Sequence, residues 1–226
     1  MSPEQFRRDG YGITRAGFSA AQVKEMIEML PTLDGAAGSR NLLTQPYFRE
    51  LARDRRLLDL VKSCLGAEAR AVRGILFDKA LDTNWALGWH QDNKIAVTAR
   101  HDVPGYKSWS VKEGIPHCKP PLRVLESMVA LRIALDKNDL TNGPLLVIPG
   151  SNRYSFLTRE QANELAKGDQ VTCLAESGDV VIMSSLTLHA SGKVTEPRHR
   201  RVIQLEYAAA NLDPPITWVF APAFSG

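Results

Sequence analysis

The sequence has few cysteines, and none of them form a pair of the kind that binds a metal or closes a small disulfide framework. The 226 residues include three cysteines, Cys64, Cys118 and Cys173, which are far apart and odd in number. No C-x-x-C motif is present, so neither a disulfide scaffold nor a thiolate zinc site is indicated. We interpret the cysteines as reduced thiols, which predicts a cytoplasmic protein.

The chain also lacks a long apolar segment and a strong excess of one charge. No run of about 18 apolar residues occurs, so no membrane-spanning helix is expected, and the first ten residues have no apolar stretch typical of a signal peptide. The net charge is only +3, and Lys and Arg are scattered along the chain. We therefore expect neither a membrane nor a nucleic acid as partner. Oligomeric state is not indicated.

What the sequence does contain is enough apolar material for one buried core. Hydrophobic residues make up 44% of the chain and charged residues 23%, which is typical of a single globular domain, here 1–226. Residues 10–14 are expected to form a strand. Ser19 is a good N-cap for a helix that reaches Pro31, and the apolar spacing of 48–65 predicts a second helix that ends at Gly66.

From residue 71 onward the apolar segments are short, β-branched and separated by turn residues, as expected of strands. Two helices followed by about seven short strands predict an α+β protein, mainly β, with an antiparallel sandwich or barrel as its core. The expected strands lie in RGILFDKA (73–80), WALGWHQDNKIAV (85–97), LESMVALRIALD (125–136), PLLVIPG (144–150), VVIM (180–183) and RRVIQLEYA (200–208).

One stretch between these strands, 101–121, is rich in proline and carries Tyr106, Trp109 and two histidines. We interpret it as one long loop. Loops of this length inside a compact domain are commonly active-site lids, and this one is predicted to be such a lid.

The sequence Trp89-His90-Gln91-Asp92 predicts a metal site. Side chains two apart on a strand point to the same face, so His90 and Asp92 can reach one ion. His189 is the best third ligand, because it follows a Gly-Asp turn and an apolar strand. Two imidazoles and one carboxylate on one side of an ion form the facial triad of non-haem iron(II) oxygenases. We expect these three residues to be both the metal ligands and the catalytic centre.

Three further residues are candidates for binding 2-oxoglutarate, the usual cosubstrate of such a triad. Arg200 stands eleven residues after His189 at the head of a strand, and a bidentate arginine suits the distal carboxylate. Ser191 lies two residues past His189 and is expected to hydrogen-bond the cosubstrate. Lys79, on a preceding strand, is expected either to contact the cosubstrate or to be an exposed strand lysine.

Three other residues are candidates for contacting the substrate. Arg132 is one charge in an otherwise apolar strand, and such a charge needs a partner. It is expected to bind an anionic substrate, to help bind 2-oxoglutarate, or to form a salt bridge at a sheet edge. Trp109 is predicted to line the pocket from the lid, and Trp85 to lie beside the approach to His90.

In these ordered motifs the sequence resembles the phytanoyl-CoA dioxygenase (PhyH) family of 2-oxoglutarate oxygenases. The matching segments are GYGITRAGFSAAQVKEMI (10–27), FDKALDTNWALGWHQD (77–92), NGPLLVIPGSN (142–152) and ESGDVVIMSSLTLHASGKVTEPRHRRVIQLEYA (176–208). The resemblance implies a double-stranded β-helix (jelly-roll) core, cupin-like, with the N-terminal helices packed on one outer face. It also implies that His90, Asp92 and His189 ligate iron and that Arg200 binds 2-oxoglutarate.

The resemblance further implies oxidation of an unactivated C–H bond in a small molecule, such as an amino acid derivative, a carboxylic acid or a natural-product intermediate. Asp92 is retained, whereas halogenating relatives have a small residue there, so the resemblance implies hydroxylation or another oxidation rather than halogenation. The family often has a histidine after Pro-Gly-Ser, where this chain has Asn152, a turn position. Two alternatives remain: a cupin-like metal enzyme that does not use 2-oxoglutarate, and a non-catalytic binding barrel.

Overall fold

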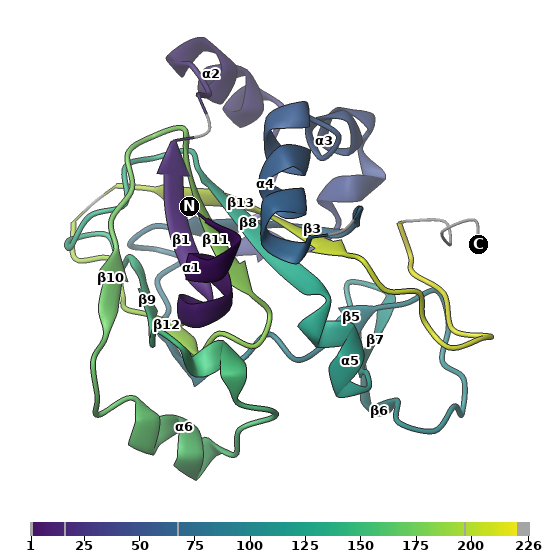
Figure 1. Ribbon diagram of the computed structural model, residues 1–226. Helices are drawn as coiled ribbons and strands as arrows, with labels where there is room; N and C mark the ends of the chain where they lie inside the picture. The colour runs from purple at the N-terminus through teal and green to yellow at the C-terminus, as the bar shows by residue number, and fades with distance from the viewer. Residues whose placement is uncertain (1, 16, 67, 197, 221–226) are drawn as a thin grey trace.

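The computed structural model describes residues 2–15, 17–66, 68–196 and 198–220 (Figure 1). Two antiparallel sheets form the core. The larger has the order β1-β11-β8-β13-β3-β2 and the smaller the order β10-β9-β12-β4. The larger sheet is built from β1 (Tyr11–Arg15), β2 (Gly38–Ser39), β3 (Arg70–Lys79), β8 (Met128–Ala134), β11 (Asp179–Ser184) and β13 (Arg200–Ala208). The smaller is built from β4 (Leu87–His90), β9 (Leu145–Val147), β10 (Val171–Cys173) and β12 (His189–Ser191). The predicted jelly-roll core, mainly β, is confirmed.

The N-terminal helices pack on the outer face of the larger sheet, as predicted (Figure 1). Leu57 and Val61 of one helix lie in the same buried cluster as Leu131 of β8 and Leu205 of β13. The helices are α1 (Pro3–Asp9), α2 (Ala20–Glu28), α3 (Pro46–Leu51), α4 (Arg55–Leu65), α5 (Leu122–Glu126) and α6 (Arg159–Leu165), with 3₁₀ turns at Leu42–Thr44 and Ser151–Arg153. Among the described residues, no helix is long and apolar enough to cross a membrane.

The predicted helix over 48–65 is wrong in one respect, because the structure divides it into α3 and α4. Asp54 lies between them with an extended backbone, and its side chain accepts a hydrogen bond from the Arg56 amide at 2.9 Å. This is an N-cap, so a new helix begins where the apolar spacing alone predicts continuation. The predicted cap at Ser19 and the predicted helix end at Gly66 are both confirmed.

The prediction that 101–121 is one long loop is also wrong. The segment contains β6 (Lys107–Lys112) and β7 (Ile115–Lys119), which join β5 (Ile95–Ala96) in a third, antiparallel sheet. Glu113 and Gly114 connect Lys112 to its partner Ile115 as a two-residue turn, both with positive φ. That backbone matches the twist of a hairpin, and it lets the strands pair despite Pro116.

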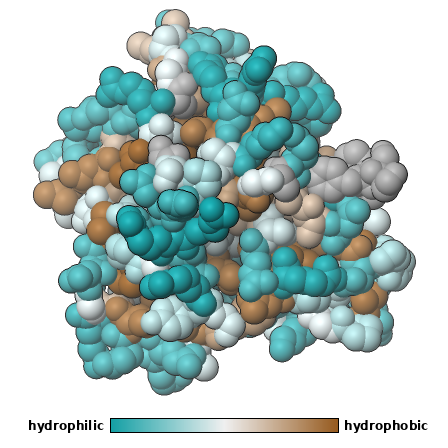
Figure 2. Space-filling model, in the orientation of Figure 1, coloured by the Kyte–Doolittle hydropathy of each residue, from teal (hydrophilic) through white to brown (hydrophobic). Residues whose placement is uncertain are grey.

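Successive side chains on the central strands point to opposite faces, one toward the helix-packed core and the next into the space between the sheets. On β8, Leu131 and Ile133 belong to the cluster beneath the helices, whereas Arg132 points the other way and lines a cavity. On β13, Leu205 packs outward and Gln204 lines the cavity. Hydrophilic residues cover most of the face shown in Figure 2. Polar groups buried inside the sandwich are therefore the unusual feature of this fold.

The Asp54 cap gives a test of the fold. Replacing Asp54 with Ala should lower the free energy of unfolding by about 1 kcal/mol, because the first turn of α4 loses a hydrogen-bond acceptor. Urea denaturation followed by circular dichroism measures this. Asp59→Ala is the matched control, since its side chain lies on α4 but is 69% exposed. Equal stability of the two variants would contradict the assigned cap.

Candidate metal and cofactor site

The metal site is organised by the pairing of β4 with β12. His90 ends β4 and lies directly opposite His189, the first residue of β12. Their ring centroids are 4.1 Å apart. Asp92 lies two residues beyond the end of β4, and its backbone amide donates to the Ser185 carbonyl at 2.9 Å. The structure thus brings together the three predicted ligands, although Asp92 follows the strand rather than lying on it.

Gln91 explains how Asp92 is held without a regular strand. Its side chain is buried, and its amide donates to the carbonyls of Leu186, at 2.9 Å, and Ser155, at 3.2 Å. Its side-chain oxygen accepts from the Leu157 amide at 3.0 Å. These bonds fix the backbone between the two ligands, with Gln91 turned away from them.

The three ligand side chains have the geometry of a single ion site. The Asp92 carboxylate oxygens lie 3.9 Å from Nε2 of His90 and 3.9 Å from Nε2 of His189. The ligand atoms all lie within 4.8 Å of one another. Because all three come from one side, they leave room for further ligands, as in the facial triad of non-haem iron.

Hydrogen bonds prepare both imidazoles to bind a metal, and burial adds to this at His189. Nδ1 of His90 contacts the Gly88 carbonyl at 2.7 Å, and Nδ1 of His189 contacts the Thr187 carbonyl at 2.9 Å. When each Nδ1–H donates to its carbonyl, the lone pair of Nε2 is free for an ion. Burial lowers the pKa of His189 to about 4, which keeps it neutral. Burial acts to raise the pKa of Asp92, but His189 and His90 outweigh it and the pKa is lowered. The donor set fits iron(II).

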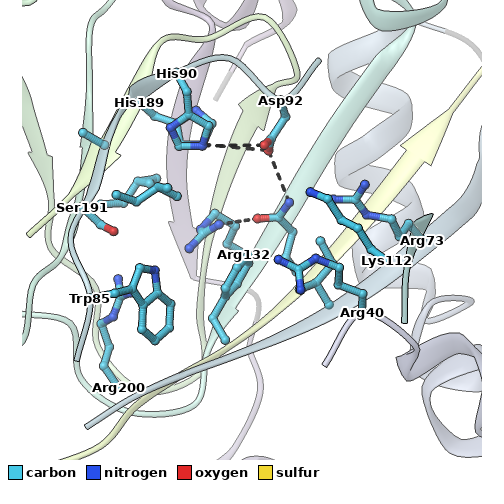
Figure 3. A pocket seen from close by; sticks show the side chains of 16 residues that line it. Arg40, Arg73, Trp85, His90, Asp92, Lys112, Arg132, His189, Ser191 and Arg200 are labelled. Carbon is cyan, nitrogen blue, oxygen red and sulfur yellow. Dashed lines mark hydrogen bonds and ion pairs between the residues drawn. The ribbon is translucent and has the colours of Figure 1, made fainter. Parts of the chain in front are cut away.

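A cavity of about 220 Å³ extends from this triad between the two sheets (Figure 3). Arg200 lines it and is 2% exposed. Its buried Nε has no hydrogen-bond partner among the described residues, and no carboxylate of that part of the chain pairs with it. Burial, and then repulsion by Arg132, lowers its pKa to about 9. An unpaired buried guanidinium is costly unless an anion binds it, so Arg200 fits the carboxylate of 2-oxoglutarate.

Ser191 and Trp85 line the same end of the cavity, and Lys79 contacts both of them. Lys79 is fully buried, so the alternative of an exposed strand lysine is wrong. Its Nζ donates to Ser191 Oγ at 3.0 Å and to the Gly192 carbonyl at 2.5 Å, and lies 4.9 Å from the centre of the Trp85 ring. Burial, with repulsion by Arg200 and Arg132, lowers the pKa of Lys79 to about 7.

Arg132 lies at the centre of the cavity wall and not at a sheet edge. Strand β8 runs between β11 and β13, and the Arg132 guanidinium donates to Gln204 Oε1. It also lies 5.0 Å from the centre of the Phe77 ring. Within the described residues no ion pair to Arg132 is found, so the predicted alternative of an edge salt bridge is wrong.

Trp109 is not brought to the cavity. It lies on β6 and packs against a second hydrophobic cluster, with the guanidinium of Arg100 5.9 Å from its ring centre. The predicted place of Trp109 on the cavity wall is therefore wrong. Sequence reasoning also missed several polar residues that line the cavity, namely Arg40, Arg73, Lys112 and Gln204. Arg73 shares a face of β3 with Lys79 by strand alternation, a signal that was available.

The fold and the triad together define a jelly-roll protein with a two-histidine, one-carboxylate metal centre. Residues 6–202 match the sequence profile of phytanoyl-CoA dioxygenase (PhyH). The chain therefore belongs to the PhyH family, as its ordered motifs predict.

Characterised relatives and solved structures agree with this membership. The chain is 26% identical over 200 residues to ectoine dioxygenase of Sphingopyxis alaskensis, covering 80% of this chain and 54% of the relative. It is 27% identical over 173 residues to dioxygenase af480 of Aspergillus fumigatus, covering 76% and 48%. The chain thus spans about half the length of these relatives. The crystal structure of EctD from S. alaskensis in its apo form has a TM-score of 0.71 and 25% identity, covering 97% of this chain and 80% of that one.

The triad makes a direct prediction for metal binding. Asp92→Ala should lower the affinity for iron(II) by more than the 10–100-fold that loss of an outer partner typically costs, because a ligand itself is removed. Anaerobic titration with iron(II), followed by metal analysis after desalting, measures this. Asp102→Ala is the control, since that side chain is 95% exposed. Full iron retention in Asp92→Ala would refute the site.

Buried Lys79 predicts how stability depends on pH in the protein without cosubstrate. Its pKa is about 7 in the folded state, against 10.5 as the ordinary value. Between these values the unfolded chain binds more protons, so the contribution of Lys79 to stability rises with pH. The slope is at most about 1.4 kcal/mol per pH unit. Urea unfolding from pH 7 to 10 should show a rise in wild type that Lys79→Met lacks; parallel curves would contradict the assignment.

Proposed function

We propose that the protein is an iron(II)- and 2-oxoglutarate-dependent dioxygenase that hydroxylates a C–H bond of a small molecule. The observation that carries this proposal is buried Arg200, a guanidinium without a carboxylate partner among the described residues, in the same cavity as the triad. Iron(II), with 2-oxoglutarate and O₂, supplies the oxidising chemistry; the protein supplies position and a shielded cavity.

Several residues of the cavity have a defined part in this proposal. His90, Asp92 and His189 would hold the iron, since two imidazoles and one carboxylate are the ligand set of non-haem iron(II) oxygenases. Arg200 binds the distal carboxylate of 2-oxoglutarate through paired N–H donors. Ser191, which accepts a hydrogen bond from Lys79, orients that end of the cosubstrate, and Trp85 closes it. The retained carboxylate of Asp92 leaves no space for a halide, which supports hydroxylation.

The cavity supports a small molecule as substrate. Its volume of about 220 Å³ is lined from both sheets and suits a compact organic compound better than a polymer. One solved relative, EctD of S. alaskensis, is described with 2-oxoglutarate and 5-hydroxyectoine; its identity to this chain is 24% and its TM-score 0.72, over 98% of this chain and 82% of that one. We propose an amino acid derivative, a carboxylic acid or a natural-product intermediate, with neither nucleic acid nor membrane as partner.

The cytoplasm is the proposed location. The three cysteines are free and buried, and burial raises the pKa of Cys64 and Cys118 to about 11. Thiols kept protonated and inaccessible are typical of proteins that fold in a reducing compartment.

Substitution of Arg200 also distinguishes the proposed function from that of a cupin-like enzyme that does not use 2-oxoglutarate. In Arg200→Ala, the 2-oxoglutarate concentration that gives half of the visible metal-to-ligand charge-transfer band should rise at least about tenfold. Losing a charge-assisted bidentate contact costs about 1.5–3 kcal/mol. The measurement is an anaerobic titration of iron(II)-loaded protein with 2-oxoglutarate.

Arg201→Ala is the matched control for this titration. Arg201 is the next residue on β13 but pairs with Asp136 outside the cavity, at 2.7 Å. Its removal should leave the band unchanged. Iron binding without any band in wild type would favour the cupin-like alternative, and absence of iron binding would favour a non-catalytic barrel.

A further inference from the structure

A second group of cations lines the cavity on the side away from Arg200. In Figure 3, Arg40, Arg73 and Lys112 lie together opposite Trp85 and Arg200. They come from three separate parts of the fold: Arg40 follows β2, Arg73 lies on β3, and Lys112 ends β6. Convergence of three cations from distant segments is costly through mutual repulsion unless something anionic offsets it.

The chain itself offsets only part of this charge. Arg73 pairs with Glu206 at 3.0 Å, and Arg40 pairs with Glu113 at 3.2 Å. Lys112 has no ion-pair partner among the described residues. Its side chain is exposed, but partial desolvation beside the cavity lowers its pKa, and Arg40 and Arg73 lower it further. In addition, the buried Nε of Arg73 has no hydrogen-bond partner in the described part of the chain.

When iron(II) and 2-oxoglutarate are bound, the expected charges of the site still leave Lys112 without a compensating anion. The cavity lining has five cationic side chains and one carboxylate, Asp92. Glu206 and Glu113 neutralise two of the cations, Arg73 and Arg40. A divalent iron, Asp92, Arg200 and the two carboxylates of 2-oxoglutarate compensate one another. Arg132, which is buried, and Lys112, which is exposed where it lines the cavity, then remain as positive charges without a compensating anion.

We propose that the substrate carries an oxyanion, a carboxylate or a phosphate monoester, that binds Lys112 with Arg40 and Arg73 beside it. This rests on the proposed function, since the same cavity holds the iron and 2-oxoglutarate. The anion removes the repulsion among the three cations and supplies an acceptor near Arg73. Because Arg200 lies on the other side of the cavity, the cosubstrate and the substrate have separate cationic partners. Lys112 also gives the β6–β7 hairpin a role in selecting the substrate.

Three probes of similar size and different charge test this proposal. Protein loaded anaerobically with iron(II) and saturating 2-oxoglutarate is titrated with benzoate, phenyl phosphate and neutral benzyl alcohol, by calorimetry. At least one anion should bind about tenfold or more tightly than benzyl alcohol, and comparison of the two anions identifies which oxyanion fits. In Lys112→Met this preference should fall to about threefold or less. Lys107→Met is the matched control, since Lys107 is exposed on the same strand, as Lys112 is, but does not line the cavity.

The outcomes separate this proposal from the assignment of the enzyme. The charge-transfer band should form equally well in wild type, Lys112→Met and Lys107→Met. If the band forms but neither anion binds more tightly than benzyl alcohol, the oxyanion proposal fails while the proposed function stands. An anion affinity that weakens as 2-oxoglutarate is raised would place the probe at Arg200, which also overturns it. Failure of the band in wild type would instead remove the proposed function.

Discussion

The antiparallel register between strands is the constraint on which the site depends. Pairing of β4 with β12 sets His90 opposite His189, and pairing of β13 with β3 sets Arg200 opposite Lys79. A shift of one residue in either pair would turn these side chains to the other face. The apolar residues of β13, such as Leu205 and Tyr207, must face the helices, so the core enforces the register that the site requires. The same strand register therefore determines both the packing of the core and the geometry of the site.

Burying polar side chains inside the sandwich costs free energy, and hydrogen bonds and ion pairs among them reduce that cost. Gln204 accepts from Arg132 and donates to Glu206 at 2.9 Å, and Glu206 pairs with Arg73. This chain of contacts satisfies groups that would otherwise be buried without partners. It ends at Asp92, 3.4 Å from the Gln204 amide. The metal ligand is thus supported by a network from the larger sheet, although its own backbone follows β4 of the smaller one.

Much of this could be predicted from the sequence, because several signals are local. The cap at Ser19, the strand alternation and the His90-Gln91-Asp92 motif each depend on residues close in the chain. The predictions that the structure contradicts also have physical causes. Asp54 divides the predicted helix through a single N-cap hydrogen bond. The Glu113-Gly114 turn closes a hairpin in a segment whose prolines favoured the prediction of a loop. Arg40 lies in a connection and reaches the cavity only through pairing of β2 with β3, which no local pattern reveals.

The two buried cations near Trp85 differ in what they can contribute, and the difference explains why one is the stronger candidate for binding an anion. With a pKa of about 9, Arg200 stays charged near neutrality, whereas Lys79 has a pKa of about 7 and is only partly protonated there. The donors of Lys79 already serve Ser191 and Gly192, while Nε of Arg200 has no partner within the described chain. A planar fork with permanent charge suits a carboxylate better than a lysine already engaged in hydrogen bonds. Arg200 therefore supplies the fixed charge, and Lys79 holds the strand end beside it in place.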